Sequence, residues 1–457
     1  MIETLGIDGP SIASVCSLSG QKGAAVISVD QARCCYCGGC VSVCPEDALY
    51  LAGTRLQVSQ TCTECGLCLP ACPVGALSDS PDRRADTVPP PFRPHYDIIV
   101  AGAGPGGSMA AWEAARQGLT VLLLEKRQEI GSPVRCAEAV PPEALAVLVD
   151  PDPAWISAHL SLAQIITREG GRVVHKWQGS GGTGYVLERR VFDRMLAEQA
   201  AQAGAQVQVK TPVVGLLHNS GTVGGVIAEW QGRRYEIEAS IVIAADGIES
   251  RVGAWAGLDT RLEIGDTMTC AQYLLAGIDW DPSCMGCWID QEVAPGGYAW
   301  VFPKGEGRAN VGLGLQADLA ETTALSYLER FIEGEPALRS GTPVTLIAAN
   351  VPVSPPCSRL VTNGVMLVGD AARQVDALTG GGIIHAMTAG KLAAQVAAQA
   401  LDRSDVSAHG LAAYEQQVEQ AIGRKLARSY RLRETFAPEE RSSRRFLRLF
   451  AVATGSK

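Results

Sequence analysis

Short apolar runs alternate along the chain with longer stretches of mixed polarity, an order typical of α/β proteins. The runs at 98–101 and 121–124 are continuously apolar, as in strands buried on both faces of a parallel sheet. Residues 187–203 have helical periodicity, and later apolar runs at 241–245 and 365–368 predict further strands. Because these strands are widely separated along the chain, we expect an inserted domain between them.

Apolar and polar residues alternate in strand fashion mainly between about 255 and 350. This region predicts an antiparallel sheet. It would form the insert and serve as a substrate domain.

Glycines follow the first apolar run at a spacing that favours phosphate binding. Gly102, Gly104 and Gly107 fit G-x-G-x-x-G at the point where a strand should turn into a helix. The helix N-terminus offers free N–H groups to a pyrophosphate. Glu125 ends the second strand, at the distance along the chain where an acidic residue suits a ribose hydroxyl. The pattern predicts a dinucleotide site. The alternative is a glycine-rich loop with Glu125 as a solvated strand end.

Composition narrows the functional classes. A chain of 457 residues can hold two or three domains, and its 48 acidic against 39 basic residues argue against nucleic-acid binding. No charged-then-apolar leader opens the chain and no apolar run is long enough to span a membrane, so we expect a cytoplasmic protein. Ten of the 15 cysteines fall between Cys16 and Cys72, which suggests metal binding rather than disulfides.

Eight of these cysteines form two copies of C-x2-C-x2-C-x3-C-P, and the first copy begins at Cys34 and the second at Cys62. Such runs bind cubane 4Fe–4S clusters, and the fourth cysteine of each run reaches the other cluster. The predicted ligands are Cys34, Cys37, Cys40 and Cys72 for one cluster, and Cys62, Cys65, Cys68 and Cys44 for the other. Zinc is the competing metal for thiolate quartets. Cys35 is off the spacing and is interpreted as a bystander. Residues 28–79 resemble bacterial two-cluster ferredoxins.

The proline-rich residues 78–95 read as a semi-rigid linker. The predicted division is then a two-cluster ferredoxin domain (28–79), a linker (80–95), a nucleotide-binding domain (96–254 and 351–400), a substrate domain (255–350) and C-terminal helices (401–457).

Four further motifs carry a family resemblance. Ala245-Asp246-Gly247 and Gly369-Asp370-Ala371-Ala372 resemble FAD-dependent enzymes of the glutathione-reductase and aromatic-hydroxylase fold. More narrowly, residues 369–394, the YxWxFP stretch at 298–303 and Arg135-Cys136-Ala137-Glu138 are similar to the geranylgeranyl reductase family. The resemblance covers about 96–400. A fused ferredoxin departs from the usual member, which takes electrons from a separate donor.

The resemblance implies an FAD-binding Rossmann-like domain with an inserted antiparallel sheet. It also implies cofactor contacts. The implied FAD-contacting residues, beyond the three glycines and Glu125, are Arg135, Arg189, Asp246, Gly369, Asp370, Gly381 and Gly382. Asp370 would bind the ribityl chain and Arg189 the phosphates. Asp370 could instead be a helix N-cap, Arg189 a solvated charge, and the triple glycine a flexible turn.

Candidate catalytic residues are Cys136, Tyr298 and Trp300. Cys136 lies in the segment that the resemblance places near the flavin, although buried cysteines are often inert. Tyr298, Trp300 and Phe302 alternate along a strand and share one face, either as plain core or as the wall of an apolar tunnel. Cys284 and Cys287 form a lone C-x2-C, which we interpret as structural.

The sequence therefore predicts a flavin-dependent reductase that saturates C=C bonds of a geranylgeranyl or other polyprenyl chain. Electrons would pass from a low-potential donor protein through two 4Fe–4S clusters to FAD. An electron-transfer flavoprotein acting on a quinone or partner protein shares every cofactor motif, and a redox-sensing protein is a third possibility. Nine basic residues between 424 and 448 are either a solvated face or a patch for anionic lipid at a membrane surface.

Overall fold

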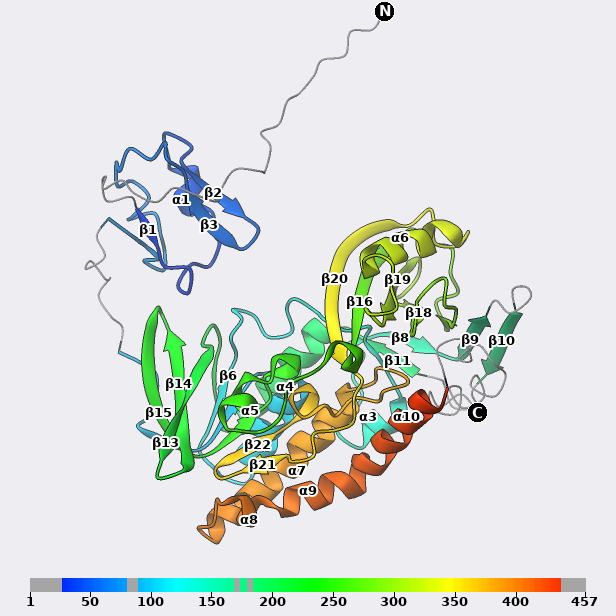
Figure 1. The fold of residues 1–457 in the computed structure, drawn as a ribbon. Coiled ribbons are helices and arrows are strands. Elements are labelled where there is room, and N and C mark those ends of the chain that lie inside the picture. The colour runs from blue at the N-terminus through cyan, green and yellow to red at the C-terminus, as the bar shows by residue number, and fades with distance from the viewer. Residues whose placement is uncertain (1–26, 80–88, 168–172, 179–183, 437–457) are drawn as a thin grey trace, which may run out of the picture. The chain divides into compact units, whose positions relative to one another are not determined.

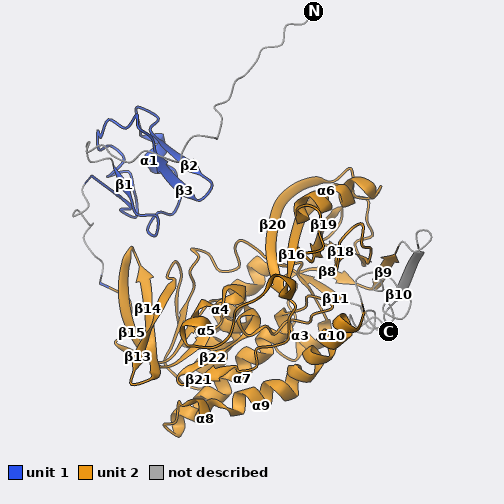
Figure 2. Ribbon diagram, viewed as in Figure 1, with its two compact units in different colours: residues 1–89 blue, residues 90–457 orange. Residues whose placement is uncertain are grey.

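The structure is a computed structural model that describes residues 27–79, 89–167, 173–178 and 184–436. It divides into two compact units, residues 1–89 (unit 1) and residues 90–457 (unit 2), shown in Figure 2. Cys16, residues 80–88 of the predicted linker and the basic residues beyond 436 lie outside the described part of the chain. Among the described residues, no helix is both long and apolar enough to cross a membrane.

The described residues of unit 1 form two short pairs of antiparallel strands and one helical turn (Figure 1). The elements are β1 (Ser28–Val29) paired with β4 (Leu77–Ser78), β2 (Leu49–Ala52) paired with β3 (Arg55–Val58), and α1 (Gly39–Ser42). Its core combines a few aliphatic side chains, including Leu49 and Leu56, with the buried thiols of Cys34, Cys40 and Cys68. Sulfur therefore occupies much of the interior of this unit.

The larger sheet of unit 2 has a parallel core and an antiparallel edge. Its strand order is β12-β6-β5-β15-β14-β13, with β22 also paired to β15 and β21 to β22. The bounds are β5 (His95–Ala101), β6 (Val121–Leu124), β12 (Gln206–Gln208), β13 (Val213–Asn219), β14 (Thr222–Trp230), β15 (Arg233–Ala244), β21 (Val361–Thr362) and β22 (Val365–Leu367). The four parallel strands predicted from apolar runs are all present. Their continuous apolar sequence reflects burial on both faces.

Helices cover this parallel sheet and pack against one another (Figure 1). They include α2 (Pro105–Arg116), α4 (Arg189–Gln202) and α7 (Ile383–Asp402). Gly390 lets α7 approach α2, because a Cβ there would lie 2.1 Å from the Gly106 carbonyl oxygen. The nucleotide-binding fold predicted from the sequence is thus present.

A second, seven-stranded sheet forms the inserted part of unit 2. Its order is β10-β9-β17-β18-β19-β16-β20. The bounds are β9 (Leu162–Thr167), β10 (Val173–Gln178), β16 (Thr267–Ala276), β17 (Cys284–Trp288), β18 (Tyr298–Pro303), β19 (Arg308–Leu315) and β20 (Thr342–Pro352). Helix α6 (Ala324–Gly334) packs against it. All neighbours are antiparallel except β9 and β17. Since β9 and β10 precede residue 255, this sheet draws on more of the chain than the range 255–350.

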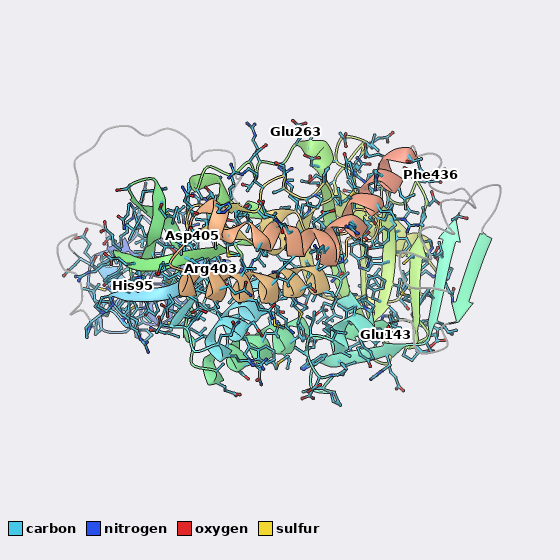
Figure 3. The ribbon with its side chains drawn as sticks, turned by 90° about the horizontal axis from the view of Figure 1, so that it is seen from below. His95, Glu143, Glu263, Arg403, Asp405 and Phe436 are labelled. Carbon is cyan, nitrogen blue, oxygen red and sulfur yellow. The ribbon has the colours of Figure 1, made fainter. Side chains whose placement is uncertain are left out.

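The remaining elements complete unit 2 around these two sheets. They are β7 (Ala139–Val140), β8 (Ile156–Leu160) and β11 (Gly184–Leu187) in a small sheet; α3 (Pro142–Ala146), α5 (Arg251–Trp255), α8 (Ala408–Leu411), α9 (Ala413–Val418) and α10 (Arg424–Thr435); the 3-10 turns η1 (Gly247–Glu249), η2 (Ile264–Asp266) and η3 (Gly369–Ala372); and the π-helix η4 (Glu419–Gly423). Figure 3 shows the side chains, with Phe436 directly after the end of α10.

Candidate functional site

In unit 1, five cysteines line a small cavity. Four of them, Cys34, Cys37, Cys40 and Cys72, are the set predicted for one cluster, and the fifth is Cys35, which was interpreted as a bystander. Burial raises the pKa of the Cys40 thiol, and the nearby charges of Cys72 and Cys34 raise it further. Among the described residues, no three His, Cys, Asp or Glu side chains converge as a single metal ion requires. Thiols set around a space are the arrangement that a cluster bound at its corners requires.

The duplication in unit 1 extends to backbone conformation and hydrogen bonding. Residues with the left-handed backbone conformation recur at equivalent positions of the two cysteine runs: Tyr36 with Glu64, Gly38 with Gly66, and Asp47 with Gly75. The Ala48 N–H donates to the Cys44 sulfur at 3.2 Å, and the Ala76 N–H donates to the Cys72 sulfur at 3.1 Å. These are the fourth cysteines of the two runs. Equivalent N–H···S bonds stabilise thiolate charge at both predicted clusters.

Unit 2 contains a cavity of about 1010 Å³. It is at the upper limit of ordinary ligand pockets. Every residue predicted to bind FAD or to act in catalysis lines it: Gly102, Gly104, Gly107, Glu125, Arg135, Cys136, Arg189, Asp246, Tyr298, Trp300, Gly369, Asp370, Gly381 and Gly382. The fold thus brings together segments that are far apart along the chain. Their individual roles remain predictions.

The three glycines of the first motif have different surroundings. Gly102 has φ 108°, and a Cβ there would lie 2.3 Å from the Ala245 carbonyl oxygen. A Cβ on Gly107 would lie 1.9 Å from the Gly102 carbonyl oxygen. Beside Gly104, by contrast, there is nothing within 4 Å. Two glycines therefore permit close packing, and the third leaves open space where a pyrophosphate can approach the N-terminus of α2.

Glu125 is buried, which excludes a solvated strand end. Its carboxylate accepts hydrogen bonds from the Ala103 N–H at 3.0 Å and the Arg127 N–H at 2.9 Å. The pKa of Arg127 is lowered by burial and by the nearby charge of Arg135. Sequence reasoning missed Arg127. Two neighbouring guanidinium groups beside the glycine turn fit an anionic ligand such as the FAD pyrophosphate.

Two aspartates of the cavity are buried with few hydrogen-bond donors around their carboxylates, and polar groups of a ligand could supply such donors. Asp246 accepts a hydrogen bond from the Val252 N–H at 3.0 Å, but its buried Oδ1 has no partner among the described residues. Burial raises the pKa of Asp246 and of Asp370, and the charge of Arg189 opposes the rise at Asp370. Asp370 caps no helix, contrary to one sequence alternative, since η3 and α7 lack side-chain caps. The hydroxyl groups of a bound flavin could donate hydrogen bonds to these two carboxylates.

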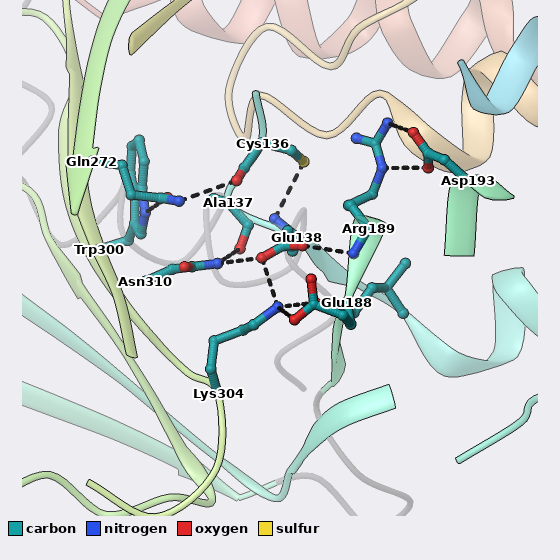
Figure 4. A network of polar contacts seen from close by, with 11 residues as sticks. Cys136, Ala137, Glu138, Glu188, Arg189, Asp193, Gln272, Trp300, Lys304 and Asn310 are labelled. Atoms are coloured by element: carbon teal, nitrogen blue, oxygen red, sulfur yellow. Dashed lines mark hydrogen bonds and ion pairs between the residues drawn. The ribbon is translucent and has the colours of Figure 1, made fainter. Parts of the chain in front are cut away.

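Arg189, at the first turn of α4, is paired rather than solvated. Its Nε and Nη2 donate to the two carboxylate oxygens of Asp193, both at 2.7 Å (Figure 4). Burial alone would lower the pKa of Arg189, but the charge and hydrogen bonds of Asp193 raise it. The guanidinium also lies beside Cys136. Arg189 is therefore a permanent cation in the cavity wall.

A buried ionic network holds the segment that carries Cys136, and the sequence analysis missed it (Figure 4). The Lys304 ammonium contacts Glu138 at 2.8 Å and Glu188 at 3.1 Å, and it donates to the Leu187 carbonyl at 2.6 Å. The Asn310 amide donates to the same Glu138 oxygen at 2.7 Å. Glu138 and Lys304 are about 3% and 5% exposed, respectively. Glu138 ends the Arg135-Cys136-Ala137-Glu138 motif and Lys304 directly follows the YxWxFP stretch, but neither motif predicted that the two would pair.

A second connection joins Cys136 to the aromatic strand. The Trp300 indole N–H donates to Gln272 at 2.8 Å, and the Gln272 amide donates to the Cys136 carbonyl at 3.1 Å. The rings of Trp300 and Phe302 are stacked 6.2 Å apart, and Tyr298 lies 5.7 Å from Trp300. These rings belong to the core and also line the cavity. The rings therefore pack in the core, as one alternative predicted, and their role as the wall of a substrate tunnel stays a prediction.

Tyr298 connects the aromatic strand to the triple-glycine loop. Its hydroxyl donates to the Thr379 carbonyl at 2.5 Å, and a Cβ on Gly380 would be 4.0 Å from that hydroxyl. Burial raises the pKa of Tyr298 well above its usual value, so the phenol stays neutral. The loop 380–382 lines the cavity and directly precedes α7, whose N-terminus favours negative charge on a ligand.

Cys284 and Cys287 are both buried on β17, three positions apart. Side chains at that spacing in a strand point to opposite faces. The two sulfurs do not form a chelating pair, in keeping with a structural interpretation.

Three family models match the chain. They are the geranylgeranyl reductase catalytic domain over residues 266–351, the FAD dependent oxidoreductase over 97–292, and the 4Fe-4S binding domain over 27–50 and 59–78. The last match covers both cysteine runs and confirms iron–sulfur binding over zinc. FAD and two 4Fe–4S clusters are the cofactors.

Related proteins support the same family assignment. The chain is 49% identical over 343 residues to a digeranylgeranylglycerophospholipid reductase of Methanothrix thermoacetophila, covering 74% of this chain and 87% of the relative. A Methanosarcina acetivorans protein of the same description is 50% identical over 316 residues, 68% of this chain and 77% of its own. A geranylgeranyl bacteriochlorophyll reductase-like structure from Thermoplasma acidophilum superposes with a TM-score of 0.73 at 38% identity, over 79% of this chain and 91% of its own. The chain belongs to the geranylgeranyl reductase family of FAD-dependent oxidoreductases and carries a 4Fe–4S ferredoxin domain in unit 1.

Proposed function

We propose that the protein saturates isolated C=C bonds in the prenyl chains of a glycerophospholipid. The observation that carries this proposal is the shared cavity of unit 2. Its apolar aromatic wall, formed by Tyr298, Trp300 and Phe302, continues into the glycine loop at 380–382. An alkene chain lying on that wall would be next to the predicted flavin position. The relatives that act on digeranylgeranylglycerophospholipid support the substrate class.

Reduced FAD, when bound, supplies hydride to one alkene carbon, and the other carbon takes a proton. Cys136 can hold that proton at its sulfur, since burial raises the pKa of the thiol above its ordinary value. The neighbouring Arg189 cation would stabilise the thiolate left after donation. Gln272 connects the Cys136 carbonyl to Trp300, and this connection holds the proton donor at a fixed position relative to the aromatic wall. Exclusion of water by this apolar wall favours attack on an unactivated alkene.

The thiolates of unit 1 hold the clusters that supply single electrons from a low-potential donor protein. Two electrons and two protons are consumed for each reduced bond. An unconjugated alkene is a poor hydride acceptor, so low-potential input suits the reaction. The N–H···S bonds at Cys44 and Cys72 would set the potentials of both clusters.

The test is an anaerobic assay of the purified holoprotein reduced with dithionite. With a digeranylgeranyl phospholipid, mass spectrometry should find two added hydrogen atoms per reduced bond. Cys136→Ala should lower kcat with FAD content unchanged, whereas Cys357→Ala, a buried cysteine outside the cavity, should not. Flavin reoxidation by a quinone but by no prenyl lipid would instead assign an electron-transfer flavoprotein.

Peripheral contact with a membrane surface is a further part of the proposal. The exposed Ile264 of η2 supports it, and the adjoining Gly265 carbonyl accepts a hydrogen bond from Arg433 of the basic helix α10. Liposomes containing anionic lipid should co-sediment the protein at low salt and release it at high salt. Sedimentation independent of both salt and lipid charge would contradict it.

A further inference from the structure

One face of α10 lines the large cavity of unit 2 with both basic and apolar groups. Lys425, Arg428, Ser429 and Leu432 belong to the lining. Their spacing of i, i+3, i+4 and i+7 places them in one stripe along the helix. Leu432 packs against the cluster that contains Trp300 and Phe302, so the stripe runs from the aromatic wall toward the two cations.

The orientation of this stripe is fixed by buried contacts on the rest of α10. Leu426 is about 1% exposed in the main core. Arg433 donates to the Val353 carbonyl at 3.1 Å and to the Gly265 carbonyl at 3.4 Å. The π-helix η4 directly precedes α10 and changes the angular register of the helix at this point. Lys425 and Arg428 therefore reach the cavity because of how α10 is anchored.

The two cations have no ionic partner in the part of the chain that the structure describes. None of the ion pairs found there engages Lys425 or Arg428. Both side chains are exposed at the edge of the cavity. The charge of Lys425, together with burial, lowers the pKa of His385 near the start of α7. His385 and Lys425 both line the cavity.

We propose that Lys425 and Arg428 form a binding site for the phosphate group of the prenyl-lipid substrate. The inference rests on the proposed function and adds the recognition of the polar end of the substrate. From Lys425 to Leu432 the helix rises about 10 Å. A phosphate at the cations thus leaves the attached chain to lie on Leu432 and the aromatic wall. Flexible, solvated cations suit phosphate recognition without a buried-charge penalty.

The test compares substrates that share a prenyl chain and differ only in phosphate. The holoenzyme in neutral detergent micelles is assayed with geranylgeranyl phosphate, with a digeranylgeranyl phospholipid and with phosphate-free geranylgeraniol. In Lys425→Gln/Arg428→Gln, KM should rise about tenfold or more for a phosphate-bearing substrate, with kcat retained. KM for geranylgeraniol should be unchanged.

The matched control is Arg424→Gln/Arg431→Gln. It removes the same charge from the same helix at exposed positions that do not line the cavity. KM for all three substrates should stay at the wild-type value. Equilibrium binding followed by tryptophan fluorescence gives a second readout that needs no turnover, and the double variant should lose affinity for geranylgeranyl phosphate but not for geranylgeraniol.

Three results would overturn the site: equal losses for phosphate-bearing and phosphate-free substrates, equal losses in the control variant, or no loss at all. A loss with both phosphate-bearing substrates, or with either one alone, supports it and tells the two sources of phosphate apart. If the wild type reduces none of the prenyl substrates, the proposed function fails. The fluorescence measurement still decides whether the site binds phosphate.

Discussion

In unit 1 all eight predicted cluster ligands lie between Cys34 and Cys72, whereas the cavity of unit 2 is lined by residues from 101 to 433. The ligands of unit 1 are also part of its core, since the thiols of Cys34, Cys40 and Cys68 are buried among few aliphatic side chains. In unit 2 most of the large core lies outside the cavity. Cofactor binding and folding should therefore be coupled in unit 1 and separable in unit 2.

This difference can be measured separately in the two units. All eight tryptophans lie beyond residue 111, so tryptophan fluorescence reports only unit 2. Iron content and the visible absorbance of the clusters report only unit 1. Each substitution below tests one side of the comparison.

The largest effect is expected for Cys34→Ser. The variant should lose about half of the iron and much of the structure of unit 1, because a small domain with little apolar core depends on its metal sites. Iron analysis and limited proteolysis of unit 1 are the measurements. Cys35→Ser is the control, because Cys35 is off the ligand spacing and its thiol donates to the Arg33 carbonyl. Equal iron loss in both variants would contradict the ligand assignment. Flavin content should be unchanged in each.

Gly107→Ala and Gly104→Ala should separate folding from cofactor binding in unit 2. The methyl group added by Gly107→Ala would overlap the Gly102 carbonyl oxygen, so this variant should lose both FAD and several kcal/mol of stability. The methyl group added by Gly104→Ala meets no protein atom within 4 Å, so this variant should fold normally. It should nevertheless bind FAD about tenfold or more weakly. Flavin absorbance after gel filtration and urea unfolding followed by fluorescence test both. Two equally stable, equally flavinated variants would show that the glycine turn does not form the pyrophosphate site.

Lys304→Met tests the ionic network beside the catalytic candidate. It leaves Glu138 buried without its cation, at a cost of about 3–5 kcal/mol in the free energy of unfolding of unit 2. Adding Glu138→Gln should recover much of that loss, because the amide removes the unpaired charge. Urea unfolding of the single and double variants gives the coupling energy. A loss below about 1 kcal/mol for Lys304→Met would mean that solvent reaches the Glu138 carboxylate.

The same contrast explains what the sequence could and could not predict. Ligand spacing in unit 1 is local and duplicated, so the four cysteines predicted for one cluster, all of which line its cavity, could be named in advance. The glycine turn of unit 2 was equally visible, because phosphate binding requires glycines at fixed positions. The network of Glu138, Lys304 and Asn310 could not be found this way, although Glu138 belongs to one of the family motifs. The three residues meet only through pairing of distant strands, and no local spacing relates them.

Strand register accounts for a second limit. Strand β9 lies far ahead of the predicted substrate region in the sequence but pairs with β17 in parallel. An apolar run such as β9 is compatible with either sheet, since periodicity shows burial and not the partner strand. The sheet to which β9 belongs therefore became clear only from the fold. Gln272 was missed for a related reason, because a single polar residue within a strand usually faces solvent, whereas Gln272 is buried.

The smallest effect concerns pH and His385, a buried side chain at the start of α7. Burial lowers the pKa of His385 below 6.5, with a further contribution from Lys425, so the folded state holds the neutral ring. The unfolded chain takes up the proton near pH 6.5, and stability from this group is present above that pH and lost as the pH falls below it. His385→Asn should flatten the fall in the free energy of unfolding between about pH 7 and 5.5, by up to about 1.4 kcal/mol per pH unit. Asp246 and Asp370 have raised pKa values, so their contribution to stability changes with pH in the opposite direction. Both aspartates are present in the wild type and in the variant, so their contribution cancels when the two pH profiles are subtracted. Because the readout is tryptophan fluorescence, the measured pH dependence of the free energy of unfolding belongs to unit 2 alone. A pH dependence that is the same in wild type and variant would place the His385 ring in contact with water.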